Sequence, residues 1–109
     1  MPTHIYRKLV RDRIPEIVRA DGGTPTVKTL DDAAFESALR VKLVEEAQEA
    51  VAAPDEPEIK KELADIYEVV QALCRLHGFS EQTILDEQKR RRDERGGFEQ
   101  RTWLESIEE

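Results

Sequence analysis

The sequence of 109 residues is poor in cysteine, histidine, aromatic residues and long apolar runs. With two histidines, neither preceded by glutamate at the third position, it lacks the Glu-x-x-His motifs of a ferritin-like di-iron site. No apolar run approaches the roughly 20 residues of a membrane span, and the N-terminus has no signal-peptide hydrophobic region. We therefore expect a cytoplasmic protein. The few aromatic residues are all explained equally well as core or interface residues, so they assign no nucleobase pocket.

The net charge and the length of the chain further restrict the possible functions and the number of domains. The net charge is −7 and the isoelectric point is about 4.9, which argues against nonspecific nucleic-acid binding and against binding to an anionic membrane. A chain of this length forms one domain, residues 1–109, with a core so small that oligomerisation would help it. The single cysteine, Cys74, falls near the apolar side of its helix and is predicted to be a small buried apolar residue.

Periodicity and capping residues predict an all-α fold. Helices are expected over residues 13–20, 32–52, 56–77 and 81–95, with N-caps at Asp12, Asp31, Asp55 and Ser80. Residues 24–30 are read as an extended connector or a minor strand. The tail, residues 98–109, carries Phe98, Trp103 and Leu104, which we expect to pack on the core or on a partner chain.

Two acidic clusters lie on the two long helices: Glu45-Glu46-Ala47-Gln48-Glu49, and, twelve residues later, Glu62-Leu63-Ala64-Asp65. At about 100° per residue, Glu46 and Glu62 fall inside the apolar stripes of their helices rather than on the polar faces. Glu49 and Asp65 fall at the stripe edges. These acids therefore do not lie where solubilising acids are expected.

The loop between the long helices, residues 53–57, is short, so the helices should form an antiparallel hairpin. In that hairpin Glu46 lies level with Asp65 and Glu49 level with Glu62, so four carboxylates converge. Unpaired carboxylates facing a core are costly and repel one another. A cation would neutralise them, and an all-oxygen, charged site suits magnesium first and manganese next. The alternative is that these four acids are ordinary, solvent-exposed surface residues.

Basic residues that could contact phosphates occur on the first long helix and on the last helix. Lys42 lies one turn before Glu46 on the same face, and Lys89, Arg92 and Arg95 share one face of the last helix, ahead of Gly96-Gly97. The last three would also complement the helix dipole in solvent. Tyr6, Arg11 and Arg13, in a basic N-terminal segment, are weaker candidates for phosphate contact. His4 and His77 are expected to be structural or solvated.

The pattern Glu-Glu-x-x-Glu, twelve residues, then Glu-x-x-Asp resembles the signature of the MazG-type all-α NTP pyrophosphohydrolases. Residues 8–15, Lys-Leu-Val-Arg-Asp-Arg-Ile-Pro, and residues 95–98, Arg-Gly-Gly-Phe, are similar to the small members called phosphoribosyl-ATP pyrophosphohydrolase-like. The resemblance covers nearly the whole chain. The chain departs from two-domain MazG proteins because it has one copy of the signature.

The resemblance implies that Glu46, Glu49, Glu62 and Asp65 ligate magnesium and that Glu45 is a catalytic acid that supports the site or orients water. It implies hydrolysis of a nucleoside triphosphate, or a related nucleotide such as phosphoribosyl-ATP, to the monophosphate and pyrophosphate by a homodimer or higher homo-oligomer. The alternative hypothesis is a non-catalytic helical module that binds a metal or nucleotide for regulation or assembly. The nucleotide base and the phosphorus attacked stay open.

Overall fold

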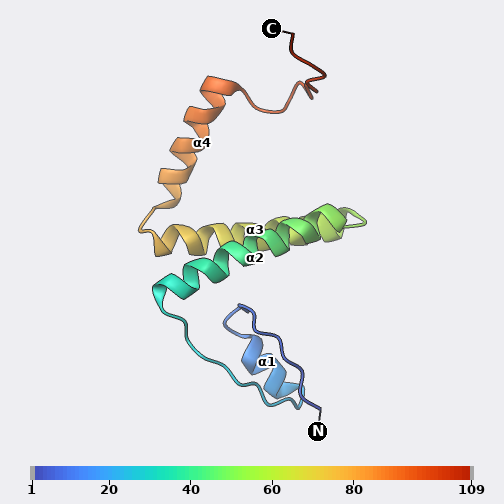
Figure 1. Ribbon diagram of the computed structural model, residues 1–109, viewed down its shortest axis with the longest axis vertical. Coiled ribbons are helices and arrows are strands. Elements are labelled where there is room, and N and C mark those ends of the chain that lie inside the picture. The colour runs from blue at the N-terminus through green and yellow to red at the C-terminus, as the bar shows by residue number, and fades with distance from the viewer. Residues whose placement is uncertain (1, 109) are drawn as a thin grey trace.

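The computed structural model describes residues 2–108, and this part of the chain contains four helices and no strand. They are α1 (Ile14–Ala20), α2 (Asp32–Ala52), α3 (Glu56–Leu76) and α4 (Glu81–Arg95). Figure 1 shows α2 and α3 side by side in a hairpin, α1 on one side of it and α4 on the other. The predicted all-α class and the helical hairpin are confirmed. No helix among these residues has the length and apolarity needed to cross a membrane.

Capping side chains set the starts of the three longer helices as predicted. Asp31 accepts a hydrogen bond from the Ala34 backbone N–H at 2.9 Å, and Asp55 accepts one from Glu58 at 3.0 Å. Ser80 accepts one from Thr83 at 3.2 Å. Each cap satisfies one of the backbone N–H groups that a helix leaves without a partner in its first turn.

The predicted cap of the first helix is wrong. The residue in the N-cap position of α1 is Arg13 rather than Asp12, and its side chain makes no capping hydrogen bond. The Ile14 backbone N–H instead donates to the Arg11 carbonyl at 3.0 Å, and a proline in the first turn removes another free donor. Backbone carbonyls thus take the place of a side-chain cap for the Ile14 and Ile17 N–H groups in this first turn.

Within residues 2–108, the connector and the tail have no regular secondary structure, and the tail does not pack on the core. Residues 24–30 form the extended connector rather than a strand. In the tail, Phe98 and Trp103 are 97% and 81% exposed, so they do not dock on the core of this chain. Of the two predicted roles for the tail, packing on a partner chain is the one left untested. Cys74 is half-buried rather than fully buried.

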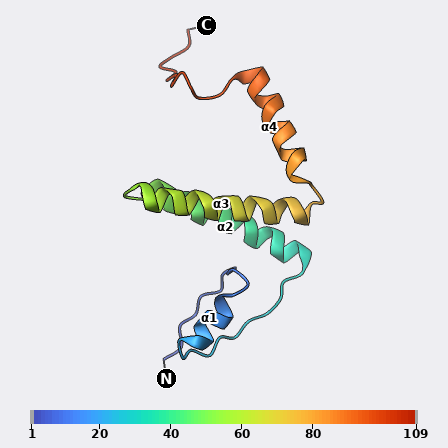
Figure 2. The same ribbon diagram turned by 180° about the vertical axis from the view of Figure 1, so that it is seen from behind.

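The packed centre of the structure is the α2–α3 hairpin, seen from behind in Figure 2. Four residues among those described are buried, and only two of them, Leu39 and Val69, are apolar. The other two are the acids Glu46 and Glu62. His77, after the end of α3, pairs with Glu36 of α2 and stacks on Phe79 with ring centroids 5.5 Å apart, which ties the open end of the hairpin together. Of the two roles expected for His77, structural or solvated, these contacts favour the structural one.

The described chain is far from compact. Its radius of gyration is 18.6 Å, whereas a compact domain of this length has about 13 Å. It exposes 10119 Å² of accessible surface, whereas a folded monomer of this mass exposes about 6,200 Å². The elongation, 63 × 35 × 28 Å, arises because α1 and α4 extend away from the hairpin (Figures 1 and 2).

We predict that Leu39→Ala destabilises the hairpin by about 2–5 kcal/mol, because it removes one of the two buried apolar side chains and leaves a cavity. Urea unfolding followed by far-UV circular dichroism measures the change. Val51→Ala is the matched control on the same helix, since Val51 is 90% exposed; it should stay within about 0.5 kcal/mol of the wild type. Equal losses in both variants would contradict this assignment of the core.

Candidate functional site

The middle of the hairpin brings together three of the four predicted metal ligands. Carboxylate oxygens of Glu46 and Glu49, from α2, and of Glu62, from α3, all lie within 4.8 Å of one another. We call these three residues the acidic cluster. They come together because Glu46 and Glu49 are separated by one helical turn and the antiparallel packing sets Glu62 beside them.

Two members of the acidic cluster are buried without full compensation. Glu46 and Glu62 are each 7% exposed, and the Oε2 atom of each has no hydrogen-bond partner. Burial, followed by interaction with the carboxylates of Glu49 and Glu46, raises the pKa of Glu62 to about 7. A carboxyl group with this pKa is partly protonated at neutral pH, where an ordinary glutamate is ionised.

Lys42 supplies the positive charge nearest to the cluster on α2. Its Nζ lies 3.5 Å from Glu45 Oε2 and 3.6 Å from Glu46 Oε1, and the side chain is largely buried. Lys42, predicted to bind substrate, is thus engaged with the acids. Glu45, predicted to be catalytic, borders the cluster with a partly exposed carboxylate. This exposure leaves Glu45 accessible to water, in contrast to Glu46.

Asp65, the fourth predicted ligand, lies next to this cluster in the sequence, one turn after Glu62, but has a different partner. Its Oδ1 accepts a hydrogen bond from Arg11 Nη2 at 2.6 Å. Arg11 comes from the segment before α1, far away in the sequence. Arg11 therefore contacts a predicted metal ligand, although sequence analysis ranked it below the basic residues of α4.

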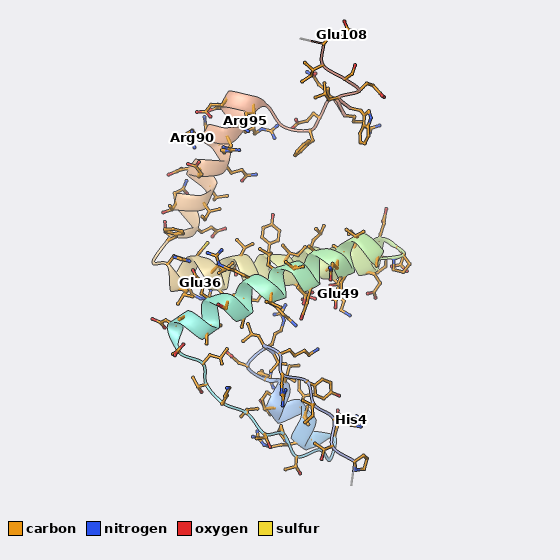
Figure 3. The ribbon with its side chains drawn as sticks, in the orientation of Figure 1. His4, Glu36, Glu49, Arg90, Arg95 and Glu108 are labelled. Carbon is orange, nitrogen blue, oxygen red and sulfur yellow. The ribbon has the colours of Figure 1, made fainter. Side chains whose placement is uncertain are left out.

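The basic residues of α4 are not brought to the acidic cluster. Figure 3 labels Arg90 and Arg95 on α4, which runs away from the hairpin that carries Glu49. Lys89 bonds to Asp93 at 2.6 Å, and Arg92 pairs with Glu99. The predicted substrate-binding residues Lys89, Arg92 and Arg95 are thus separated from the acids within this chain.

An open cavity of about 370 Å³ borders the cluster on α2. Its lining residues are Lys8, Glu45, Gln48, Glu49 and Ala52. The α2 members recur at helical spacing on one face, and Lys8 reaches them from the N-terminal segment. Sequence analysis missed Lys8. The signal that could have found it is the concentration of Arg7, Lys8, Arg11 and Arg13 in an otherwise acidic chain.

Within the described residues the fold is all-α, and its central hairpin buries the two carboxylates of Glu46 and Glu62. A curated protein from Mycolicibacterium smegmatis (strain ATCC 700084 / mc(2)155), described as uncharacterized, is 54% identical over 46 residues, which are 42% of this chain and 47% of that protein. The match thus spans about half the length of this relative. No protein-family model and no solved structure matches the chain.

Two features reduce the negative charge of the buried acids. Lys42 and a proton on Glu62 offset part of the negative charge. The Oε2 atoms of Glu46 and Glu62 remain without partners, in a cluster where each acid has a carboxylate oxygen within 4.8 Å of the others. A divalent cation would satisfy both atoms and displace the proton.

We predict that burial of Glu62 makes the metal-free protein less stable as pH rises. Its pKa is about 7 in the folded chain against an ordinary value of 4.5, so between these values the folded state binds more protons than the unfolded state and the free energy of unfolding falls with pH. Glu62→Gln cannot titrate. The stability of the wild type relative to this variant should therefore fall between pH 4.5 and 7 and level off above.

Urea unfolding of both proteins in chelator measures this difference. Glu68→Gln, an exposed change on the same helix, is the control and should show no such trend relative to the wild type. A difference between wild type and Glu62→Gln that does not change over this pH range would mean that Glu62 titrates normally.

Proposed function

We propose that the chain is a cytoplasmic, magnesium-dependent nucleotide pyrophosphohydrolase of the MazG type, similar to the small phosphoribosyl-ATP pyrophosphohydrolase-like proteins. It would hydrolyse a nucleoside triphosphate, or a related nucleotide such as phosphoribosyl-ATP, to the monophosphate and pyrophosphate. The observation that carries the proposal is the pair of buried, unpartnered carboxylate oxygens on Glu46 and Glu62, within a three-acid cluster formed across two antiparallel helices.

The donor set of this cluster fits magnesium. All its donors are carboxylate oxygens, which hard divalent ions prefer, with manganese as the second choice. Glu46, Glu49 and Glu62 would hold the ion, and Asp65 would join them from the next turn of α3. Orphaned acceptors in a cation site are expected, because the ion takes the place of hydrogen-bond donors.

When bound, magnesium would neutralise charge on the phosphates and lower the pKa of a water. The other roles fall to the side chains of the chain. Glu45, partly exposed beside the cluster, would accept a proton from the attacking water or orient it. The oxygen of that water bonds to the α or β phosphorus while the bond from that phosphorus to the bridging oxygen breaks. Lys42 would then be free to contact phosphate once the ion takes over Glu46.

We further propose that the active form is a homodimer or higher homo-oligomer, which would complete the helical bundle. The chain exposes 10119 Å², about 4,000 Å² more than expected for a compact monomer of its mass. Obligate interfaces bury about 2,000–5,000 Å². The exposed large apolar side chains supply such a surface; on α3 and the tail they are Leu63, Tyr67, Phe98, Trp103, Leu104 and Ile107.

A second candidate function is a non-catalytic module that binds a metal or nucleotide for regulation or assembly. The observation that favours it is the separation of the α4 cations from the acidic cluster within one chain, since phosphate chemistry needs cations close to the phosphates. This candidate is distinguished by magnesium-dependent stabilisation in calorimetry without turnover of any nucleotide.

We predict magnesium-dependent release of pyrophosphate from at least one member of a panel of NTPs, dNTPs and phosphoribosyl-ATP. Glu46→Gln or Asp65→Asn should lower the rate by about a hundredfold or more, because each removes a charged ligand. A coupled pyrophosphate assay measures the rate, and far-UV circular dichroism checks that the helices persist.

The matched control is Glu68→Gln, which removes the same charge from an exposed position on α3. It should retain the wild-type rate. Equal activity in Glu46→Gln and the wild type would refute the proposed function, and stabilisation by magnesium without turnover would favour the non-catalytic module.

For the oligomer we predict a solution mass that is a multiple of 12.5 kDa, the mass of one chain. Light scattering after size exclusion measures it. Trp103→Asp should shift the mass toward one chain, because Trp103 is 81% exposed and a charge in an apolar interface is costly. Arg91→Asp is the control, at an exposed position on α4. A monomeric wild type would contradict this part of the proposal.

A further inference from the structure

The N-terminal basic segment, Arg7 to Arg13, contacts the site from outside the hairpin. Arg11 bonds to Asp65 on α3 at 2.6 Å, and Lys8 lines the cavity beside Glu45 and Glu49 on α2. One short segment therefore delivers two cations to the hairpin, Arg11 to α3 and Lys8 to the cavity beside α2. Figure 3 shows the loop before α1 approaching the hairpin near its middle.

The ion pair between Arg11 and Asp65 is expected to contribute little to the stability of the fold. The side chains are 56% and 26% exposed, and an ion pair that solvent can reach adds little to stability. The guanidinium has five N–H donors in a planar fork, a geometry suited to bidentate phosphate binding. Only its Nη2 is engaged with Asp65. Arg11 can therefore keep this contact, or exchange it, while it binds a second anion.

Lys8 has a similar freedom. Its Nζ lies 5.8 Å from the ring centroid of Tyr6, at an exposed position beside the cavity. A lysine ammonium is a mobile point charge that suits phosphate oxygens at the rim of a site. On α4, Lys89, Arg90 and Arg92 differ, because each is paired with an acid of α4 or the tail, and α4 runs away from the hairpin (Figure 3).

We propose that Lys8 and Arg11 form the phosphate-binding edge of the acidic cluster and take the phosphate chain of a nucleotide, or free pyrophosphate, together with the divalent ion. This inference rests on the proposed function, since it needs an ion at Glu46, Glu49 and Glu62. It assigns the phosphate contacts to the N-terminal segment rather than to α4. Arg11 would also position Asp65 through their ion pair.

Isothermal titration calorimetry tests the proposal without turnover. Magnesium is titrated alone, and then pyrophosphate and an α,β-imido nucleoside triphosphate are each titrated at saturating magnesium. Lys8→Ala and Arg11→Ala should each weaken both phosphate ligands by at least about tenfold, while magnesium binding to Lys8→Ala, which touches no proposed ligand of the ion, stays within about threefold of the wild type. Arg11→Lys should fall between the wild type and Arg11→Ala, because it keeps the charge and loses the fork.

The matched control is Arg19→Ala, which removes an exposed cation from α1 and should leave all three affinities unchanged. Thermal unfolding confirms that each variant is folded. If magnesium binds but the phosphate affinities of Lys8→Ala and Arg11→Ala equal those of the wild type, this inference is overturned and the proposed function is not. If the wild type binds no magnesium, both are overturned. Loss of pyrophosphate affinity alone would assign the edge to the product, and loss of both to the substrate chain.

Discussion

The structure depends on one costly interaction, the burial of the Glu46 and Glu62 carboxylates where α2 and α3 pack together. Buried carboxylates are tolerated only when their charge is offset. In the metal-free chain Lys42 near Glu46 and a raised pKa at Glu62 provide part of that offset. A cation bound there, as we propose, would replace both, and its binding would then be coupled to the folding of the hairpin.

The rest of the chain is arranged around this hairpin without packing tightly on it. Only Leu39 and Val69 are buried apolar residues among those described, and α4 and the tail extend into solvent. An exposed residue such as Trp103 has no partner surface within the hairpin. The charge of the acids is likewise only partly offset within the chain: Lys42 lies 3.6 Å from Glu46, and Arg11 pairs with Asp65, one turn after Glu62. On α4, Lys89 pairs with Asp93 instead.

Much of the fold could be predicted because its signals are local. Asp31, Asp55 and Ser80 cap the longer helices, since capping depends on residues within one turn. The burial of Glu46 and Glu62 also followed from position within the apolar stripe of each helix. The Asp12 cap failed because backbone contacts satisfy the short α1 instead. The exposure of the tail could not be predicted, because it depends on whether the folded chain offers a surface on which the tail can pack.

By itself, the sequence determined the helices, the hairpin and the acids that face its interior, because the period of a helix and the length of a loop set these within a few turns. Only the tertiary structure decided that Arg11 reaches Asp65 and that Lys8 borders the α2 acids. These contacts join residues far apart in the chain, and no local spacing encodes the path of the connector between α1 and α2. From the sequence alone, a basic segment could contact any acidic surface of the protein, and only the fold determines which acidic residues lie beside it.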